Sequence, residues 1–246
     1  MADRSADAGG QHVPAPGEDI SCALALVNTR FMSAGRPADL IEDAASAARW
    51  LAGRGLLPPE TAAVTNPAAD RAANPAADLA AHLAADPATT NPAANPAAAN
   101  PAANDPAADP AVAGRLSLLR ETIRALFAAQ AERRAPAPGD LAGLNAALAR
   151  APLLPALTWD DTGPRRGEQA PAPGTDPVDL ALARLAADAL GVLTGPGDAR
   201  PAPCGAHGCI RWFLRTHAAR QWCSARCGDR VRAARHYARH HPMAGA

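Results

Sequence analysis

Four cysteine residues near the end of the sequence have the spacing of a metal site. They are Cys204, Cys209, Cys223 and Cys227, separated in turn by 4, 13 and 3 residues. Each close pair can span one edge of a tetrahedron around Zn²⁺, and the stretch between the pairs is long enough for one hairpin that brings them together. We therefore predict that these cysteines bind one structural zinc ion, because four thiolates leave no open position for catalysis.

Other interpretations of these cysteines are weaker. Disulfide bonds suit an oxidising compartment and usually staple distant segments, whereas these cysteines are close in sequence. A catalytic zinc ion needs a position that no protein ligand fills. His207 and His217 could replace a cysteine ligand, but we expect both at the surface. The fifth cysteine, Cys22, stands apart from the cluster and is expected to be a buried small hydrophobic residue.

The residues around the cysteines predict a small zinc-stabilised unit over 200–241. Two short strands are expected at 210–215 and 221–222, joined by a turn. A helix is expected from 224 to 241, with the second cysteine pair at its first turn. Knuckle, hairpin and helix in this order are typical of a treble clef. The metal must replace a core here, because about forty residues with few large apolar side chains do not fold alone.

The charge of the chain is asymmetric although its formal net charge is zero. Residues 1–199 contain 15 Arg and 23 acidic residues, whereas 200–246 contain 9 Arg and one acid, Asp229. The two parts therefore carry about −8 and +8, and a zinc ion with four thiolates lowers the second value to about +6. A basic segment of this kind is typical of proteins that bind a polyanion, most often nucleic acid.

We expect double-stranded DNA as the partner of this basic segment. The helix carries cations around most of its circumference, while Val231, Ala234 and Ala238 can face the hairpin. Arginine can bridge phosphates or pair with guanine in the major groove. A solvated basic face that stabilises the helix C-terminus is the alternative. The residues predicted to contact DNA are Arg220, Arg226, Arg230, Arg232, Arg235 and Arg239.

The same residues resemble a known zinc finger. The similar positions are Cys204, Cys209, Trp212, Phe213 and the runs 220–224 and 227–232. They are similar to the CGNR zinc finger of bacterial proteins described as stress-induced transcription regulators. Asp229 stands where the name has Asn, and a carboxylate at that position repels phosphate.

Upstream segments resemble, in the same order, the ABATE domain that accompanies this finger. They are 26–29, 50–51 with 55–57, 119–127 and 144–145. The resemblance implies an α+β fold, in which a mainly helical N-terminal domain over 19–195 is joined to a DNA-binding treble clef.

Hydrophobic periodicity predicts the elements of the N-terminal domain. The expected elements are a short strand or early helix at 20–29, a helix from Pro37 or Asp39 to Leu51, helices at 116–127, 140–150 and 176–195, an edge strand at 153–160, and a linker at 195–197. Asp140 and Asp176 are expected to cap their helices. Leu190 and Leu193 are expected on the buried face of the last helix, and Leu141 on that of the helix at 140–150.

Two segments are expected to lie outside the packed domain. Residues 65–112 repeat Asn/Asp-Pro-Ala-Ala units, in which frequent proline prevents a long helix and favours an extended or turn-rich insert. Residues 1–18 mix Gly, Pro, Ala and charge without an apolar period, so we expect them to be disordered. Aromatic residues make up only 3% of the chain, so one large core over its whole length is not expected.

The sequence also restricts the function. No segment has the pattern of a signal peptide or a membrane span, so we expect a soluble, cytoplasmic protein without membrane partners. The sequence lacks the motifs of hydrolases, nucleotide-binding enzymes and zinc proteases, so we do not expect an enzyme.

These observations favour a zinc-dependent, DNA-binding transcriptional regulator. Its N-terminal domain is expected to sense a small molecule or to mediate oligomerisation. The polar residues that could bind a ligand there are Asn28, Arg120, Arg124 and Asn145. The alternative is a zinc-stabilised module that binds a protein or responds to oxidation and does not contact DNA.

Overall fold

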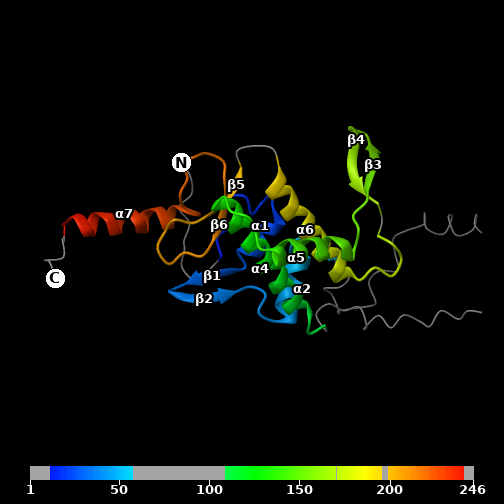
Figure 1. Cartoon of the computed structure of the whole chain (residues 1–246), viewed down its shortest axis with the longest axis horizontal. Coiled ribbons are helices and arrows are strands. Elements are labelled where there is room, and N and C mark those ends of the chain that lie inside the picture. The colour runs from blue at the N-terminus through cyan, green and yellow to red at the C-terminus, as the bar shows by residue number, and fades with distance from the viewer. Residues whose placement is uncertain (1–11, 58–108, 170, 196–198, 241–246) are drawn as a thin grey trace, which may run out of the picture.

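The computed structural model describes residues 12–57, 109–169, 171–195 and 199–240 (Figure 1). Its helices are α1 (Cys22–Val27), α2 (Ala44–Gly53), α4 (Val112–Ala131), α5 (Pro138–Arg150), α6 (Pro177–Thr194) and α7 (Ala225–His240). Its strands are β1 (Arg30–Ser33), β2 (Arg36–Asp39), β3 (Pro155–Asp160), β4 (Gly163–Glu168), β5 (Arg200–Pro203) and β6 (Trp212–Arg215). In the described ranges they pair as antiparallel hairpins β1–β2, β3–β4 and β5–β6. The predicted α+β class is confirmed.

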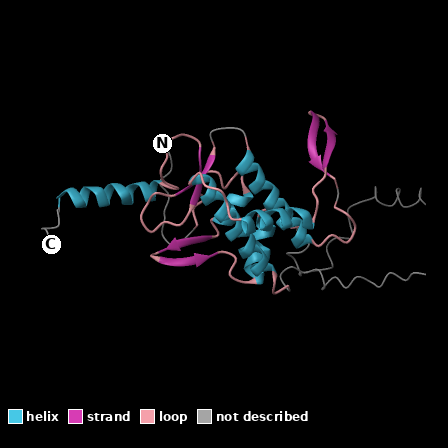
Figure 2. Cartoon of the chain, in the orientation of Figure 1, coloured by secondary structure: helices cyan, strands magenta, loops and turns pink. Residues whose placement is uncertain are grey.

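The core lies among α1, α2, α4, α5 and α6, which Figure 2 shows gathered into one body, with α7 extending away from it. Helix α4 contacts each of the other four. Its buried residues include the whole stripe that periodicity predicts: Leu116, Leu119, Ile123, Leu126 and Phe127. No described helix is both long and apolar enough to cross a membrane.

The run at 20–29 forms a short helix, α1, and not a strand. Its residues 23–27 are buried on every side, which explains why hydrophobic periodicity did not distinguish the two. Ser21 caps the helix, because its hydroxyl oxygen accepts a hydrogen bond from the amide of Leu24. Asp188 of α6 accepts hydrogen bonds from the Ser21 hydroxyl and the Ala23 amide, both at 2.7 Å. The start of α1 is thereby fixed to α6.

The start predicted for the second helix is wrong. Pro37 and Asp39 lie in β2, and α2 begins only at Ala44. A capping box sets this start: the Asp43 carboxylate accepts from the Ser46 amide at 2.7 Å, and the Asp43 amide donates to the Ser46 hydroxyl at 3.1 Å. The strands of the β1–β2 hairpin have only four residues each, and polar and apolar residues do not alternate along them, so the hydrophobic pattern did not indicate strands.

The segment at 138–195 follows the prediction in part. Asp176 caps α6 by accepting from the Val178 amide at 2.9 Å, as expected. The N-cap position of α5 is Ala137, which makes no side-chain cap, and Asp140 lies within the first turn after Pro138. The predicted strand at 153–160 pairs with β4, which lies outside the elements expected from the sequence.

Parts of the predicted buried faces are wrong as well. Leu141 on α5 and Leu190 on α6 are exposed. Alanine residues of α6, including Ala181, Ala186 and Ala189, fill the closely packed interior. Leu193 is only partly buried against the same core. Small side chains allow the helices to approach closely, a feature that a search for large apolar residues does not detect.

The prediction that residues 1–18 are disordered is wrong for 12–18. Ala15 and Glu18 are buried, and the carbonyl oxygen of Pro16 accepts a hydrogen bond from the amide of Leu214. Residues 1–11 lie outside the described part of the chain. So does most of the predicted insert at 65–112, of which the structure describes 109–112, ending in the first residue of α4.

Strand β6 joins the C-terminal unit to the helical body. Trp212 and Leu214 belong to the main hydrophobic core, and the ring of Trp212 lies 5.9 Å from that of Phe127 on α4. Phe213, between them, belongs to a second core that contains the cysteines. Because alternate residues of a strand point to opposite faces, β6 contributes side chains to both cores.

We predict that the core around α4 carries much of the folding free energy. Ile123→Ala removes a fully buried side chain and should lower the free energy of unfolding by about 2–5 kcal/mol. Leu118→Ala on the same helix should change it by less than about 0.5 kcal/mol, because Leu118 is 72% exposed. Urea unfolding of zinc-loaded protein measures both, and equal losses for the two variants would contradict this description of the core.

Candidate metal centre and basic helix

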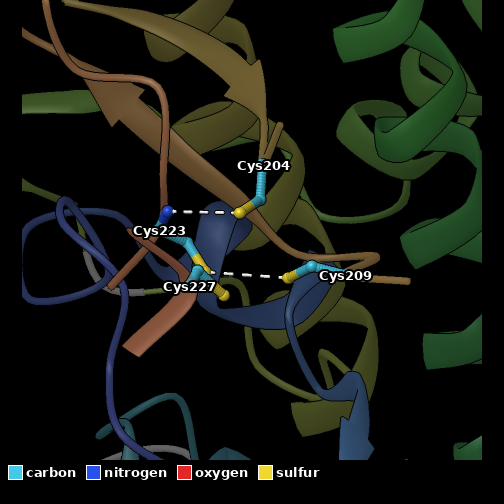
Figure 3. Close-up of side chains that lie close together, drawn as sticks. All are labelled: Cys204, Cys209, Cys223 and Cys227. Atoms are coloured by element: carbon cyan, nitrogen blue, oxygen red, sulfur yellow. Dashed lines mark hydrogen bonds between the residues drawn. The ribbon is translucent and has the colours of Figure 1, made fainter. Parts of the chain in front are cut away.

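The structure brings the four predicted metal ligands together. The sulfur atoms of Cys204, Cys209, Cys223 and Cys227 all lie within 4.8 Å of one another. Figure 3 shows the four side chains converging, and the Cys223 sulfur lies 3.7 Å from those of Cys209 and Cys227. A tetrahedral zinc ion with Zn–S bonds of about 2.3 Å requires sulfur separations of about 3.8 Å. A disulfide requires about 2.05 Å, so the cysteines are free thiols whose arrangement fits one zinc ion.

The first cysteine pair lies in the loop of the β5–β6 hairpin. The amide of Cys204 donates to the carbonyl of Arg211 at 2.9 Å, directly beyond the paired residues Pro203 and Trp212. The amide of Cys209 donates to the carbonyl of Ala206 at 3.0 Å, which closes the knuckle. Gly208 has φ +72°, a conformation that other residues rarely adopt, and it turns the chain into Cys209.

The predicted hairpin of the finger is wrong in its pairing. The sequence placed its strands at 210–215 and 221–222, on the two sides of a turn. The structure pairs β6 with β5, which precedes the first cysteine, and 221–222 is not a strand. Strand β5 has the sequence Arg-Pro-Ala-Pro. Proline cannot donate a ladder hydrogen bond and is rare in strands, so the sequence did not indicate a strand here.

The second cysteine pair lies at the start of α7. Cys227 is in the first turn, and its amide donates to the Ser224 hydroxyl at 3.2 Å. The amide of Cys223 donates to the Cys204 sulfur at 3.4 Å, and the amide of Gly205 donates to the carbonyl of Gln221 at 2.9 Å. These bonds fasten the segment before α7 to the first knuckle. The zinc ion would therefore determine the direction in which α7 leaves the body.

The four sulfur atoms lie close enough for the thiols of Cys204, Cys209 and Cys223 to change the pKa of one another. Hydrogen bonds from Cys209 and Cys223 lower the pKa of the Cys204 thiol to about 2. The same interaction with Cys204 raises the pKa of Cys209 to about 11 and raises the pKa of Cys223 as well. One thiolate is thus stabilised at the expense of its neighbours. A divalent cation is the group that makes four thiolates compatible at such short distances, and its binding releases the remaining protons.

Helix α7 extends beyond the finger (Figure 1). Val231 is the last of its residues to pack against the cysteine core. The prediction that Ala234 and Ala238 face the hairpin is wrong, because both are exposed. With 16 residues, the helix is about 24 Å long.

The predicted DNA-contacting residues lie on or next to α7. Arg220 is half-buried, whereas Arg226, Arg230, Arg232, Arg235 and Arg239 are exposed. Arg230 contacts the metal centre, and its guanidinium donates to the Cys227 sulfur at 3.8 Å. Arg232 donates to the Asp229 carboxylate at 2.5 Å and lies over the Trp222 ring. Arg235 and Arg239 follow Val231 by one and two turns.

The four residues predicted to bind a ligand have different surroundings in the structure. Asn145 is exposed on α5, and Arg120 is buried, donating to Thr29 at 2.9 Å and to Asp39 at 2.8 Å. Asn28 and Arg124 hydrogen-bond to the backbone of the finger. Three of the four thus bind other parts of their own chain. His207 and His217 are exposed, as expected, and the half-buried Cys22 lies against the main core.

Sequence reasoning missed Glu18, which lies in the segment expected to be disordered. Its carboxylate accepts hydrogen bonds from the side chains of Asn28 and Arg211, both at 2.6 Å, and from the amide of Ala15 at 2.9 Å. Burial by itself raises the pKa of Glu18, but the contact with His12, the Ala15 amide and the charge of Arg211 outweigh burial and hold the pKa below its usual value. No local sequence pattern marks this residue.

Comparison with known families agrees with the geometry. Residues 65–196, more than half of the chain, match the ABATE family model, whose description is "Putative stress-induced transcription regulator". Residues 200–240 match the CGNR zinc finger. The resemblance inferred from the sequence is thereby confirmed, although the ABATE match begins after the segments at 26–29 and 50–57 and includes the low-complexity block. No curated protein matches the chain.

Loss of one ligand should release the metal. We predict that Cys223→Ser lowers the zinc content from about one ion per chain to a small fraction of that, because the remaining sulfur atoms cannot complete the tetrahedron. Cys22→Ser, outside the cluster, should keep the full content. Metal analysis of the purified, dialysed proteins measures both. Zinc retained at full stoichiometry by Cys223→Ser would show that this cysteine is not a ligand.

Proposed function

The chain belongs to the ABATE family, and from this membership and its finger we propose that it is a zinc-dependent transcription regulator that binds double-stranded DNA through α7. The observation that carries the proposal is the exposed, arginine-bearing part of α7 beyond Val231. Beyond Val231 the helix carries Arg232, Arg235 and Arg239, and these residues are exposed. An α-helix fits the major groove of B-DNA, and arginine is the residue that most often contacts both phosphate and guanine there.

The electrostatics favour contact through this end of the molecule. The chain after residue 199 carries about +6 with its zinc ion, whereas the chain before it carries about −8. The acidic part repels phosphate, so DNA approaches the finger and α7. The cations lie on several sides of α7, and this distribution supports contacts to both phosphate strands that border the groove.

The zinc ion has a positioning role in this proposal. Cys223 and Cys227 hold the first turn of α7, and Cys204 and Cys209 hold the knuckle next to it. When bound, zinc supplies structural stabilisation and no open position for chemistry. The chain's own residues make the contacts with DNA, and the metal fixes the helix that carries them.

We propose the same cellular setting as the sequence indicates: a bacterial cytoplasm, a role in the response to stress, and no enzymatic activity. The family description supports a regulator. An effector or a second copy of the chain remains the proposed partner of the helical domain. Asn28, Arg120 and Arg124 are engaged within the chain, so an effector site built from them would need these contacts to change.

Binding to a duplex pool of random sequence across a salt series tests the proposal. Arg235→Ala/Arg239→Ala should weaken binding and lower the salt-dependence slope by about 1.8, since each lost phosphate contact removes about 0.9. The matched control is Arg165→Ala/Arg166→Ala on β4, which removes the same charge from another exposed element and should bind as the unmodified protein does.

A zinc-stripped sample should bind more weakly than the loaded protein, and sequencing of the bound duplexes should show enrichment of preferred sites. If the loaded protein ignores DNA at low salt, the proposal fails. In that case α7 would be tested for binding to an acidic protein partner. Loss of zinc on treatment with peroxide would favour the redox-responsive alternative.

We predict that Asp229 weakens DNA binding. Its carboxylate is exposed and paired with Arg232, so it neutralises one of the helix cations and repels phosphate. Asp229→Asn should therefore tighten binding several-fold at low salt. Asp161→Asn in the exposed β3–β4 turn makes the same charge change away from α7 and should have no effect. The same titration measures both, and weaker binding by Asp229→Asn would contradict the prediction.

A further inference from the structure

A buried side chain of the helical domain, Asn28, binds the backbone of Trp212, the first residue of β6. The Asn28 side chain accepts a hydrogen bond from the Trp212 amide and donates one to the Trp212 carbonyl, both at 2.8 Å. Asn28 caps the end of α1 and has no exposed surface. Its amide group thus substitutes for a neighbouring strand and satisfies both polar groups of one residue, which would be costly to leave unpaired in a buried position.

The residue before Trp212 is held by a charge pair. Arg211 donates to the Glu18 carboxylate at 2.6 Å, and the side chain of Glu18 is fully buried. The same carboxylate oxygen accepts from Asn28 at 2.6 Å, so the two contacts form one network. The carbonyl of Arg211 accepts from the amide of Cys204. Arg211 therefore contacts both Glu18, through its side chain, and the metal ligand Cys204, through its carbonyl.

The next residue towards the cysteines is held from a third element. The Arg124 guanidinium on α4 donates to the carbonyl of Ile210 at 2.9 Å. Ile210 directly follows the ligand Cys209. Three consecutive finger residues, 210–212, are thus fixed by three different parts of the helical domain: α4, the segment before α1, and the end of α1.

Close packing fixes the same strand from its other end. The Leu214 amide donates to the Pro16 carbonyl at 2.9 Å. Gly17 has φ +97°, and a Cβ at this position would lie 2.6 Å from Cγ of Leu214. The chain before α1 therefore lies directly on β6, and only glycine fits between them. A finger attached through a freely moving linker would not need such a contact.

We infer that the helical domain and the zinc centre form one thermodynamic unit, in which Asn28, Glu18 and Arg124 act as positioning residues for the knuckle that carries Cys204 and Cys209. Zinc binding then stabilises α1 and α4. By the reciprocity of linked equilibria, a partner of these helices whose affinity changes when zinc binds must change the affinity for zinc by the same factor. This inference does not depend on DNA, since all of its contacts lie within the chain.

Hydrogen exchange of the unaltered full chain, with and without a zinc chelator, provides the first test. Removal of zinc should accelerate exchange in α1 and in the second half of α4, as well as in the finger. Helix α5, which contacts α4 and α6, serves as the internal reference and should change less. Acceleration confined to 200–240 would overturn the inference, because it would show that the helical domain does not sense the metal.

Zinc transfer to a chromophoric chelator provides the second test. Asn28→Ala should release zinc at least about tenfold faster than the unaltered chain, the size of effect typical for groups that orient metal ligands. Asn145→Ala removes the same side chain from an exposed position on α5 and should release zinc at the normal rate. Glu18→Gln, which keeps the shape of the side chain and removes its charge, should lie between these two.

A spectroscopic readout separates positioning from a general loss of stability. The visible absorption of the Co²⁺-loaded protein reports the geometry of the four sulfur ligands. It should shift in Asn28→Ala and in Glu18→Gln, under conditions where circular dichroism shows the helix content unchanged. If Asn28→Ala does not fold, Glu18→Gln carries the test. Normal zinc release together with an unshifted Co²⁺ spectrum in the folded variants would overturn the inference.

Discussion

The two hydrogen bonds between the Asn28 side chain and the Trp212 backbone are the contact on which the arrangement of the molecule depends. Both partners are buried, and a buried polar group that loses its partner costs about 1–3 kcal/mol. Strand β6 therefore cannot slide or rotate on α1 without breaking bonds that water does not replace. The finger takes its position on the helical domain from this constraint.

Strand β6 then transmits that position in two directions. Trp212 and Leu214 enter the helical core, and Phe213 enters the core around the cysteines. Because alternate side chains of a strand point to opposite faces, the four residues of β6 contribute to both hydrophobic cores. The small finger core does not need to be stable alone, because it shares β6 with a larger neighbour and gains its remaining stability from metal ligation.

The metal centre links this fixed hairpin to a helix that leaves the body. Its ligands come from the loop of β5–β6 and from the start of α7, so the direction of α7 follows from the tetrahedral geometry of the ion and the position of the hairpin. The basic charge lies on the part of the helix that the body does not cover. The first turns of α7 thus contribute to the metal centre, and the later turns form the surface proposed to bind DNA.

The amino-acid sequence by itself determined the zinc ligands, the buried stripe of α4 and the basic character of α7, because ligand spacing, helical periodicity and charge are local properties. It did not determine the β5–β6 pairing, since the prolines of β5 hid the strand. Nor did it reveal the roles of Asn28, Glu18 and Arg124, whose finger partners lie 184, 193 and 86 residues away along the chain. Only the tertiary structure decided these contacts, because a buried polar side chain takes its role from the groups that folding places beside it.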